Sequence, residues 1–226
     1  MDGFIPSGTV CCAIWTSQSN VPRMLTVFQR RPGFRMDRVG VAILAGGQGT
    51  RMGGRKPERH FRGRRLIDPV LDRVSAWGVP AIICVRKHGQ VAANTFGQIL
   101  DQPEIEGPLA GLLSALAWAS STNLDLLLTL PCDAPFLPED LLSELKHASL
   151  DAAKPAVAAS NGQRHPTCAI WPVDTLLCVT TYAGSGRRSL AGALDACEAI
   201  DVCWPDGQVD VFANINTPED IIRLEL

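Results

Sequence analysis

The stretch "VGVAILAGGQGTRMGGRK", from Val39 to Lys56, joins an apolar run of six residues to a loop with five glycines, two arginines and a lysine. An apolar run of this length that ends at glycines is typical of a buried strand in a parallel sheet. Open α/β sheets bind ligands at the carboxyl ends of their strands, and the backbone amides of a glycine loop can approach a phosphate or a base edge closely. The stretch therefore predicts a strand that leads into a nucleotide-binding loop.

Two common phosphate-binding patterns do not fit this loop. A dinucleotide-binding G-x-G-x-x-G pattern that starts at Gly47 would need glycine where Met52 stands. A Walker A pattern that starts at Gly49 would need Lys and then Ser or Thr where Arg55 and Lys56 stand. The loop therefore belongs to neither of these two classes.

The rest of the chain continues the alternation that this strand begins. After Val39, apolar runs of strand length alternate with longer amphipathic stretches, as in βαβ units. The sequence therefore predicts a single three-layer α/β/α domain with a mostly parallel sheet and a Rossmann-like arrangement. Strands are expected at residues 39–44, 81–85, 124–130, 155–160, 167–171 and 210–214. Helices are expected near residues 66–77, 109–119, 138–147, 174–182, 188–196 and 218–224.

Composition and charge limit the classes of partner. A chain of 226 residues with 46% hydrophobic residues can bury a sizeable core. Of its 21 Lys and Arg, twelve lie in residues 1–65, where three of the 23 Asp and Glu lie. Positive charge concentrated beside one glycine loop suits a nucleoside triphosphate better than a nucleic acid. No apolar stretch approaches the roughly 20 residues that span a bilayer. We therefore expect no nucleic acid and no membrane among the partners.

The eight cysteines form no C-x-x-C pair and no zinc-ligand spacing. This usage predicts reduced thiols, several of them buried, and a cytoplasmic location. Residues 1–36 show no sustained periodicity, and we predict that they form a disordered extension of a domain that occupies residues 37–226. Met36 is the start that this interpretation favours, and a transit peptide is the alternative.

Five segments of the chain carry a resemblance to a known family. Besides the opening loop they are "GPLAGLLSAL" at 107–116, "LPCDAPFLPEDLL" at 130–142, "NGQRHPT" at 161–167 and "FANINTPEDI" at 212–221. From about residue 36 to its end, the chain thereby resembles the nucleotidyltransferases, in the form associated with the molybdenum cofactor guanylyltransferases, the MobA family. The resemblance implies a nucleotidyltransferase fold and a Mg²⁺-dependent reaction. In it, a terminal phosphate of molybdopterin attacks the α-phosphorus of GTP, and pyrophosphate leaves.

The resemblance assigns the triphosphate to charged residues at the ends of two strands. Arg51 and Lys56 would contact the triphosphate and the leaving pyrophosphate, and Asp133 would hold Mg²⁺. In-line displacement needs charge screening and alignment rather than a covalent nucleophile, so we interpret Cys132 as a packed thiol. Without the resemblance, the loop could be a solvated basic loop and Asp133 a turn residue or helix cap. The chain departs from the family at Arg55, where many members carry Asp.

The resemblance also assigns the guanine base. The residues whose backbone groups would contact the base are Leu44, Ala45, Gly46 and Gly47. Asp101 stands where the family places an acidic nucleotide contact, and a polar residue at a strand end is the alternative interpretation. Where the family commonly has Asn after its second strand, alignment places Cys84, or Arg86 with a small shift. A thiol forms only weak hydrogen bonds, so this contact is a second departure.

Molybdopterin, the second substrate, is assigned to the second half of the chain. The candidate residues are Arg164, His165, Arg187, Arg188, Asn214 and Asn216. Amides can read the donors and acceptors of a pterin, and arginines suit its phosphate. His165 could equally be structural, and the two asparagines could be turn formers. Because Asn214 and Asn216 alternate as they leave a predicted strand, we expect both amides to point to one side.

Two alternative functions remain open at this point. A cytidylyltransferase that acts on the same cofactor is the nearest, although its loop more often reads Ala-Ala-Gly than "LAGG". A nucleotide-binding chaperone for molybdoenzymes that lacks turnover is the other, and Arg55 and Cys84 are its only hints. The partners expected from the preferred interpretation are GTP, molybdopterin and maturation proteins of molybdoenzymes. We expect the chain itself to be a monomer.

Overall fold

A computed structural model of the chain describes residues 38–47, 55–92, 95–205 and 210–225. All of these residues belong to one compact unit, Met36–Leu226. The predicted disordered extension, residues 1–36, lies outside the described residues, as does Arg51. Within the described ranges, no helix combines the length and the apolar character needed to cross a membrane.

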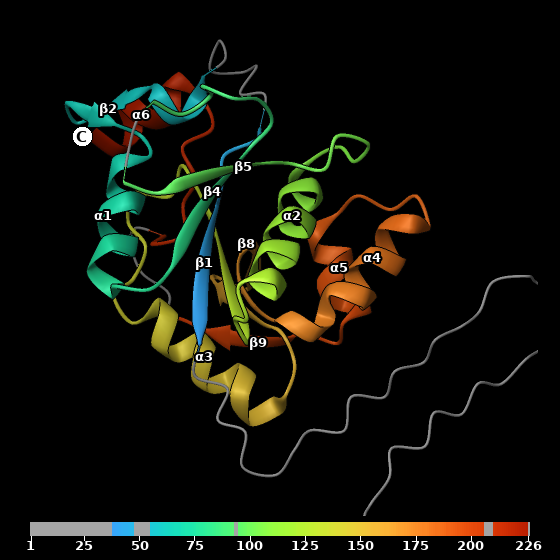
Figure 1. Ribbon diagram of the computed structural model, residues 1–226. Helices are drawn as coiled ribbons and strands as arrows, with labels where there is room; N and C mark the ends of the chain where they lie inside the picture. The colour runs from blue at the N-terminus through green and yellow to red at the C-terminus, as the bar shows by residue number, and fades with distance from the viewer. Residues whose placement is uncertain (1–37, 48–54, 93–94, 206–209, 226) are drawn as a thin grey trace, which may run out of the picture. The chain divides into compact units, whose positions relative to one another are not determined.

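A sheet with seven strands, counted over the described residues, forms the centre of this unit (Figure 1). In their order across the sheet, the strands are β5 (Gly97–Leu100), β4 (Ala81–Val85), β1 (Val39–Leu44), β6 (Leu126–Pro131), β8 (Gln163–Pro172), β7 (Ala156–Ser160) and β9 (Ile200–Cys203). The strand β8 is antiparallel to β6 and β7, and the other neighbouring pairs are parallel. The prediction of a mostly parallel sheet is confirmed.

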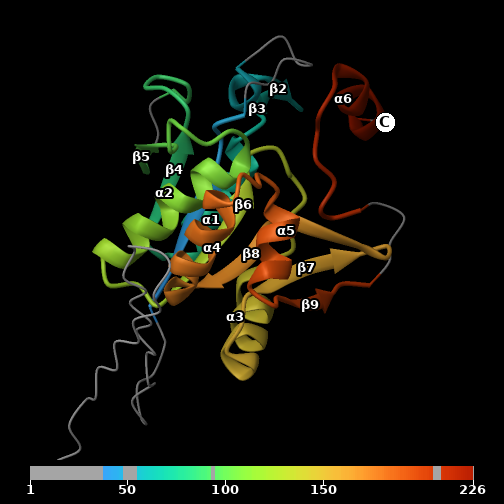
Figure 2. The same cartoon turned by 90° about the vertical axis from the view of Figure 1, so that its right-hand side faces the viewer.

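Helices cover both faces of this sheet, as Figures 1 and 2 show. The helices α1 (Asp68–Trp77) and α3 (Leu141–Ala152) pack on one face, and α2 (Pro108–Ser121), α4 (Leu176–Gly184) and α5 (Leu190–Ala196) pack on the other. Side chains of a strand alternate between the two faces, so Val41 and Ile43 join the first core while Ala42 joins the second. The predicted three-layer α/β/α arrangement is confirmed.

A small hairpin and the last helix complete the fold. The hairpin pairs β2 (His60–Phe61) with β3 (Arg64–Arg65) and follows a short 3₁₀ helix, η2 (Lys56–Glu58). The last helix, α6 (Pro218–Glu225), packs beside this hairpin through a third apolar cluster. The members of this cluster are Phe61, Leu66, Ile215, Phe136 and Ile221.

The structure differs from the sequence-based expectation at several elements. The predicted strand at residues 210–214 is wrong, because a carboxylate oxygen of Asp210 accepts a hydrogen bond from the Phe212 amide (3.0 Å) and closes a turn there. The helix expected from residue 138 begins at Leu141, after a turn. The strands β5 and β9 were not predicted, because short, half-exposed edge strands carry little apolar pattern.

The order of the strands places a crevice beside β1. From β1, the chain adds β4 and β5 on one side of it and then returns to add β6 on the other side. Such a switch point leaves room between the diverging connections at the carboxyl ends of the strands. The glycine loop that follows β1 begins at this position.

Candidate functional site

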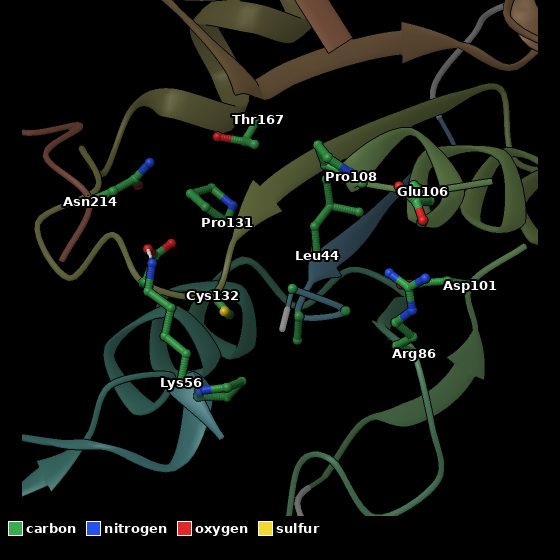
Figure 3. Close-up of a pocket in the computed structure, with 17 residues that line it drawn as sticks. Leu44, Lys56, Arg86, Asp101, Glu106, Pro108, Pro131, Cys132, Thr167 and Asn214 are labelled. Carbon is green, nitrogen blue, oxygen red and sulfur yellow. Dashed lines mark ion pairs between the residues drawn. The ribbon is translucent and has the colours of Figure 1, made fainter. Parts of the chain in front are cut away.

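A cavity of about 340 Å³ lies at the carboxyl ends of the central parallel strands (Figure 3). The predicted site residues that line it are Leu44, Ala45, Gly46, Gly47, Lys56, Asp101, Asp133 and Asn214. Arg86, the alternative candidate for the family's Asn position, also lines it, together with Glu106, Gly111 and Thr167, which the sequence analysis did not assign to a ligand. The structure therefore brings segments from both halves of the chain to one cavity.

Lys56 lies at the centre of a polar network on one side of this cavity. Its ammonium forms an ion pair with Asp133 and donates a hydrogen bond to Oδ1 of Asn216 (2.8 Å). The peptide N–H of Ile215 donates to the carbonyl of Asp133 (3.0 Å), which holds the segment with Asn214 and Asn216 against the end of β6. The network thus joins the loop after β1, the end of β6 and the segment before α6.

The carboxylate of Asp133 is buried, with 8% of its side chain exposed. Burial raises the pKa of Asp133, and the neighbouring Lys56 lowers it. A buried carboxylate is stable as an anion only beside a cation or hydrogen-bond donors, so this position selects positive charge. The adjacent Cys132 is buried as well, and burial raises the pKa of its thiol, which disfavours a nucleophilic thiolate.

Asp101 occupies the opposite wall of the cavity. One of its oxygens, Oδ1, is buried and has no hydrogen-bond partner among the described residues. Burial raises the pKa of Asp101 to about 6, although the positive charge of Arg86 opposes this effect. An orphaned buried acceptor costs free energy, roughly 1–3 kcal/mol, and a ligand with N–H donors would recover it.

Two glycines give the Asp101 carboxylate its room. A Cβ on Gly46 would collide with Oδ2 of Asp101, and a Cβ on Gly111 would lie 3.2 Å from Oδ1. By contrast, a Cβ on Gly47 would meet no described atom within 4 Å. The first of the paired glycines in "LAGG" is therefore required for packing against Asp101, whereas the second faces open space.

The structure distinguishes the two candidates for the family's Asn position. Cys84 is fully buried in the core beneath α2, and its thiol donates a weak hydrogen bond to the carbonyl of Gly111 (3.5 Å). It is not among the residues that line the cavity, whereas Arg86 is. Residues two apart in a strand point to the same face, so Cys84 and Arg86 would share a face if β4 continued. Because β4 ends at Val85, Arg86 lies beyond the strand and lines the cavity.

Gln90 is a residue of the site region that the sequence analysis missed. Its side-chain amide donates to the carbonyls of Ala45 (2.7 Å) and Gly47 (3.2 Å), and its oxygen accepts from the backbone N–H of Arg86 (2.9 Å). The side chain therefore ties the start of the glycine loop to the end of β4. No local pattern identified it, because a lone Gln in a loop resembles any solvated residue.

The N-terminus of α2 also faces the cavity. Gly107 caps it with φ 79° and ψ −170°, a conformation that is essentially restricted to glycine. Gly107 and Pro108 line the cavity together with Glu106. The positive end of the helix dipole would attract an anionic ligand at this end.

The remaining candidates of the second half lie elsewhere. Arg164 forms ion pairs with Asp195 (2.7 Å) and Asp201 (2.6 Å), and its side chain does not line the cavity. Arg187 lies over the ring of Tyr182, and Arg188 donates to the carbonyl of Ala183 at the end of α4 (2.8 Å). For these arginines, the structure shows intramolecular partners rather than a place at the cavity wall.

His165 belongs to a separate polar and aromatic cluster. Its Nε2 lies 2.7 Å from the hydroxyl of Ser160, which donates to Asp210 (3.0 Å), and its ring stacks on Phe212 with centroids 4.6 Å apart. Burial lowers the pKa of His165, and Asp210 opposes this effect. In this arrangement the imidazole packs against the segment that leads to Asn214.

The departure at Arg55 has a structural consequence. Arg55 adopts a left-handed conformation, with φ 51° and ψ 39°, immediately before Lys56. Asp and Asn tolerate this conformation better than Arg does, and a residue other than glycine pays about 1–3 kcal/mol for it. The chain therefore keeps the left-handed turn before Lys56, although Arg55 is less suited to this conformation than Asp.

Comparison with known proteins identifies relatives of this chain. A family model described as the MobA-like NTP transferase domain matches residues 41–198. A molybdenum cofactor guanylyltransferase from Cereibacter sphaeroides is 34% identical over 184 residues, which cover 81% of this chain and 93% of that protein. A protein of the same name from Rhodobacter capsulatus is 36% identical over 194 residues, with 83% and 95% covered.

Solved structures support the fold. The molybdopterin-guanine dinucleotide biosynthesis protein A of Archaeoglobus fulgidus has a TM-score of 0.67 at 24% identity, with 82% of this chain and 96% of that chain covered. The 4-diphosphocytidyl-2C-methyl-D-erythritol synthase of Anaerococcus prevotii has a TM-score of 0.65 at 17% identity, with 82% and 93% covered. The chain thus shares its architecture with enzymes whose names indicate different substrates.

Proposed function

The chain belongs to the MobA-like NTP transferase family, and from this premise we propose that it transfers GMP from GTP to molybdopterin. The products are pyrophosphate and the molybdopterin guanine dinucleotide cofactor. The observation that carries the proposal is the cavity, which joins an orphaned acceptor, Asp101, to a cation-selecting carboxylate, Asp133. Asp101 suits a base with N–H donors, and Asp133 suits a cation that neutralises the negative charge of a triphosphate.

The base would be recognised at the wall formed by Asp101 and Arg86. Guanine presents two N–H donors, at its positions 1 and 2, next to one acceptor, its oxygen at position 6. The ionised carboxylate of Asp101 can accept from the donors, and the guanidinium of Arg86 can donate to the oxygen. Adenine presents an amine in place of that oxygen, so it would leave Arg86 facing a donor. The backbone of Leu44, Ala45, Gly46 and Gly47 supplies the neighbouring surface.

The triphosphate would lie along the side of the cavity that contains Lys56. An ammonium has three N–H donors, so Lys56 can contact a phosphate oxygen while it keeps Asp133 or Asn216 as a partner. The N-terminus of α2, the positive end of a helix dipole, adds further positive potential at the cavity. Arg51, which lies outside the described residues, is proposed as a further contact to the leaving pyrophosphate.

The fit of Mg²⁺ can be judged from the environment of Asp133. Its buried carboxylate already holds one cation, the Lys56 ammonium, and Mg²⁺ commonly binds through one or two carboxylates together with substrate phosphates. We propose Asp133 as the protein ligand. When bound there, Mg²⁺ would neutralise charge on the phosphates and polarise the α-phosphoryl group. Lys56 would then turn from Asp133 towards the phosphates.

The reaction itself requires alignment more than a reactive side chain. A phosphate oxygen of molybdopterin forms a bond to the α-phosphorus, the bond from that phosphorus to the bridging oxygen breaks, and pyrophosphate departs with the electron pair. Among the candidates for molybdopterin, Asn214 alone lines the cavity, and its Oδ1 is buried without a hydrogen-bond partner among the described residues. We propose that Oδ1 of Asn214 accepts a hydrogen bond from an N–H group of the pterin there, and Thr167 lines the same cavity.

A direct assay tests the proposal. The full chain is supplied with molybdopterin, Mg²⁺ and one nucleotide, which is GTP, CTP or ATP. Pyrophosphate should be released rapidly when the nucleotide is GTP and not when it is CTP or ATP. Mass spectrometry should then detect molybdopterin enlarged by one guanylate. Release that is fastest with CTP would instead identify a cytidylyltransferase. Tight GTP binding without any release would identify a nucleotide-binding chaperone. We also propose that the active form is a monomer in the cytoplasm, which sedimentation and cell fractionation can check.

A further inference from the structure

Two half-buried cysteines lie beside each other at α4 and α5. Figure 2 shows these two helices next to each other. Cys178 belongs to α4, and Cys197 directly follows the last residue of α5. The thiol of Cys197 donates a hydrogen bond to Sγ of Cys178, with 2.8 Å between the two sulfurs. Non-bonded carbon atoms settle about 3.5–4.0 Å apart, and sulfur is larger than carbon, so these sulfurs are unusually close.

The pair differs from every other described cysteine. Cys84, Cys132 and Cys168 are buried, and Cys203 is exposed on the edge strand β9. Among the cysteines that the structure describes, the hydrogen bond between Cys178 and Cys197 is the one contact that joins two thiols. Both members are partly open to solvent, so a small oxidant can reach them.

We propose that Cys178 and Cys197 form a reversible disulfide, which makes the α4–α5 pair a redox modification site. The sulfurs of a disulfide lie about 2.05 Å apart, so bond formation requires a shift of less than about 1 Å. The oxidant that we name is a low-molecular-weight disulfide of the glutathione class. This proposal does not depend on the transferase activity, because neither cysteine lines the cavity.

The exchange proceeds in two steps. Burial and the hydrogen bond with Cys178 raise the pKa of Cys197, so we assign the first attack to Cys178. The Cys178 thiolate attacks one sulfur of the oxidant, forms a mixed disulfide and releases one small thiolate. Cys197 then loses its proton and attacks Sγ of Cys178, which releases the second small thiolate. The two cysteines are oxidised, the small disulfide is reduced, and the two protons pass to the small thiolates.

The bond would cross-link the two ends of a helical hairpin. The enclosed chain, residues 178–197, contains the connection with Arg187 and Arg188, and Arg188 already contacts the end of α4 through the carbonyl of Ala183. A cross-link restricts the unfolded chain more than the folded one, so the oxidised protein should be more stable. For a domain of this size, we expect the melting temperature to rise by roughly 5 °C or more.

The experiment uses the full, reduced chain without added nucleotide. Samples are equilibrated in glutathione buffers of increasing oxidised fraction, blocked with an alkylating agent, digested with trypsin and analysed by mass spectrometry. Cys168 and Cys178 share the tryptic peptide 165–187, and Cys197 and Cys203 share 189–223, so the linked pair is assigned by fragmentation and by variants. We expect these two peptides to become linked through Cys178 and Cys197, and the link to disappear after a reductant is added.

Matched variants make the outcome decisive. Cys178→Ser and Cys197→Ser should each abolish both the link and the rise in melting temperature, whereas Cys203→Ser should preserve both. The proposal is overturned if the peptides stay unlinked at every buffer ratio, if Cys178 accumulates only as a mixed disulfide, or if the link involves Cys203. If one serine variant does not fold, the wild-type peptide map and the Cys203→Ser result still decide the question.

Discussion

Lys56 and Asp133 form an ion pair on one side of the cavity, with 16% of the lysine side chain and 8% of the aspartate side chain exposed. The two residues come from the loop after β1 and the end of β6, and their pairing holds together the side of the site that we propose for the triphosphate. The carboxylate that we assign to Mg²⁺ is therefore already matched to positive charge. Exchange of Lys56 for Mg²⁺ and phosphate would keep this balance.

Asp133→Asn should abolish most turnover and leave the fold intact. The amide keeps the shape of the side chain but loses the negative charge that would bind Mg²⁺, so we expect turnover to fall roughly 100-fold or more. The free energy of unfolding should fall by no more than about 2 kcal/mol, because Lys56 keeps Asn216 as a partner. Pyrophosphate release and urea unfolding measure the two effects.

Glu139→Gln is the matched control for Asp133→Asn. It removes the same charge from the turn that follows β6, at a side chain that is 89% exposed. Turnover should stay near that of the wild type. Normal turnover of Asp133→Asn, or equal losses in both variants, would contradict the assignment of Asp133.

Substitutions at Arg86 test the recognition of the base. Arg86→Met removes the donor that we assign to the guanine oxygen, so the affinity for GTP should fall roughly tenfold while that for ATP changes little. The preference for GTP would thereby narrow. Calorimetric titration with both nucleotides measures the change, and Cys84→Ala serves as the comparison, because the Cys84 thiol faces the core rather than the cavity. A variant of Arg86 that keeps its full preference would count against this role.

The affinity for GTP should depend on pH through Asp101. Burial raises the pKa of Asp101 from 3.8 to about 6 in the folded chain without ligand. Compared with the unfolded chain, the folded chain therefore favours the neutral carboxyl group. Its contribution to stability is present below pH 3.8 and is lost as the pH rises through about 6. Binding of guanine donors needs the anion, so the affinity should rise up to about pH 6 and level off above it, changing about tenfold per pH unit on the acid side.

Two comparisons isolate the titration of Asp101, which faces Arg86 and Cys84. The triphosphate itself gains a proton in this pH range, but it does so equally in GTP and ATP. The ratio of the affinity for GTP to the affinity for ATP therefore depends on titration of the protein and not on titration of the triphosphate. We expect this ratio to fall below pH 6 in the wild type and to stay level in Asp101→Asn. A level ratio in the wild type would rule out Asp101 as the reader of guanine.

The two glycines of "LAGG" should differ in their tolerance of a methyl group. A Cβ on Gly46 collides with the Asp101 carboxylate, so Gly46→Ala should displace it and weaken GTP binding by roughly tenfold or more. A Cβ on Gly47 meets no atom of the described residues within 4 Å, so Gly47→Ala should bind GTP nearly as well as the wild type. Titration with GTP, and a thermal melt of each variant, separate loss of binding from loss of folding. Equal effects of the two changes would show that the contact with Asp101 is unimportant.

The sequence by itself determined the layers of the fold and the edge of the sheet at which the candidate site lies. Short continuous apolar runs, each followed by a longer amphipathic stretch, predict buried strands between helices. The glycine loop after β1 and Asp133 after β6 lie at the same edge, because parallel strands end together. Each of these inferences rests on a local pattern, and local patterns are visible along a chain.

The tertiary structure alone decided which side chains meet. The position of Arg86 at the cavity, with Cys84 in the core, depends on where β4 ends and on what covers each face. The contact of Gly46 with Asp101 joins residues from the loops after β1 and β5, and no pattern in either segment encodes that distance. The turn at Asp210 replaced a predicted strand, because one side-chain hydrogen bond outweighed the weak strand preference of a short segment. Contacts between distant segments depend on the packing of the whole core, so they could not be predicted from the order of residues.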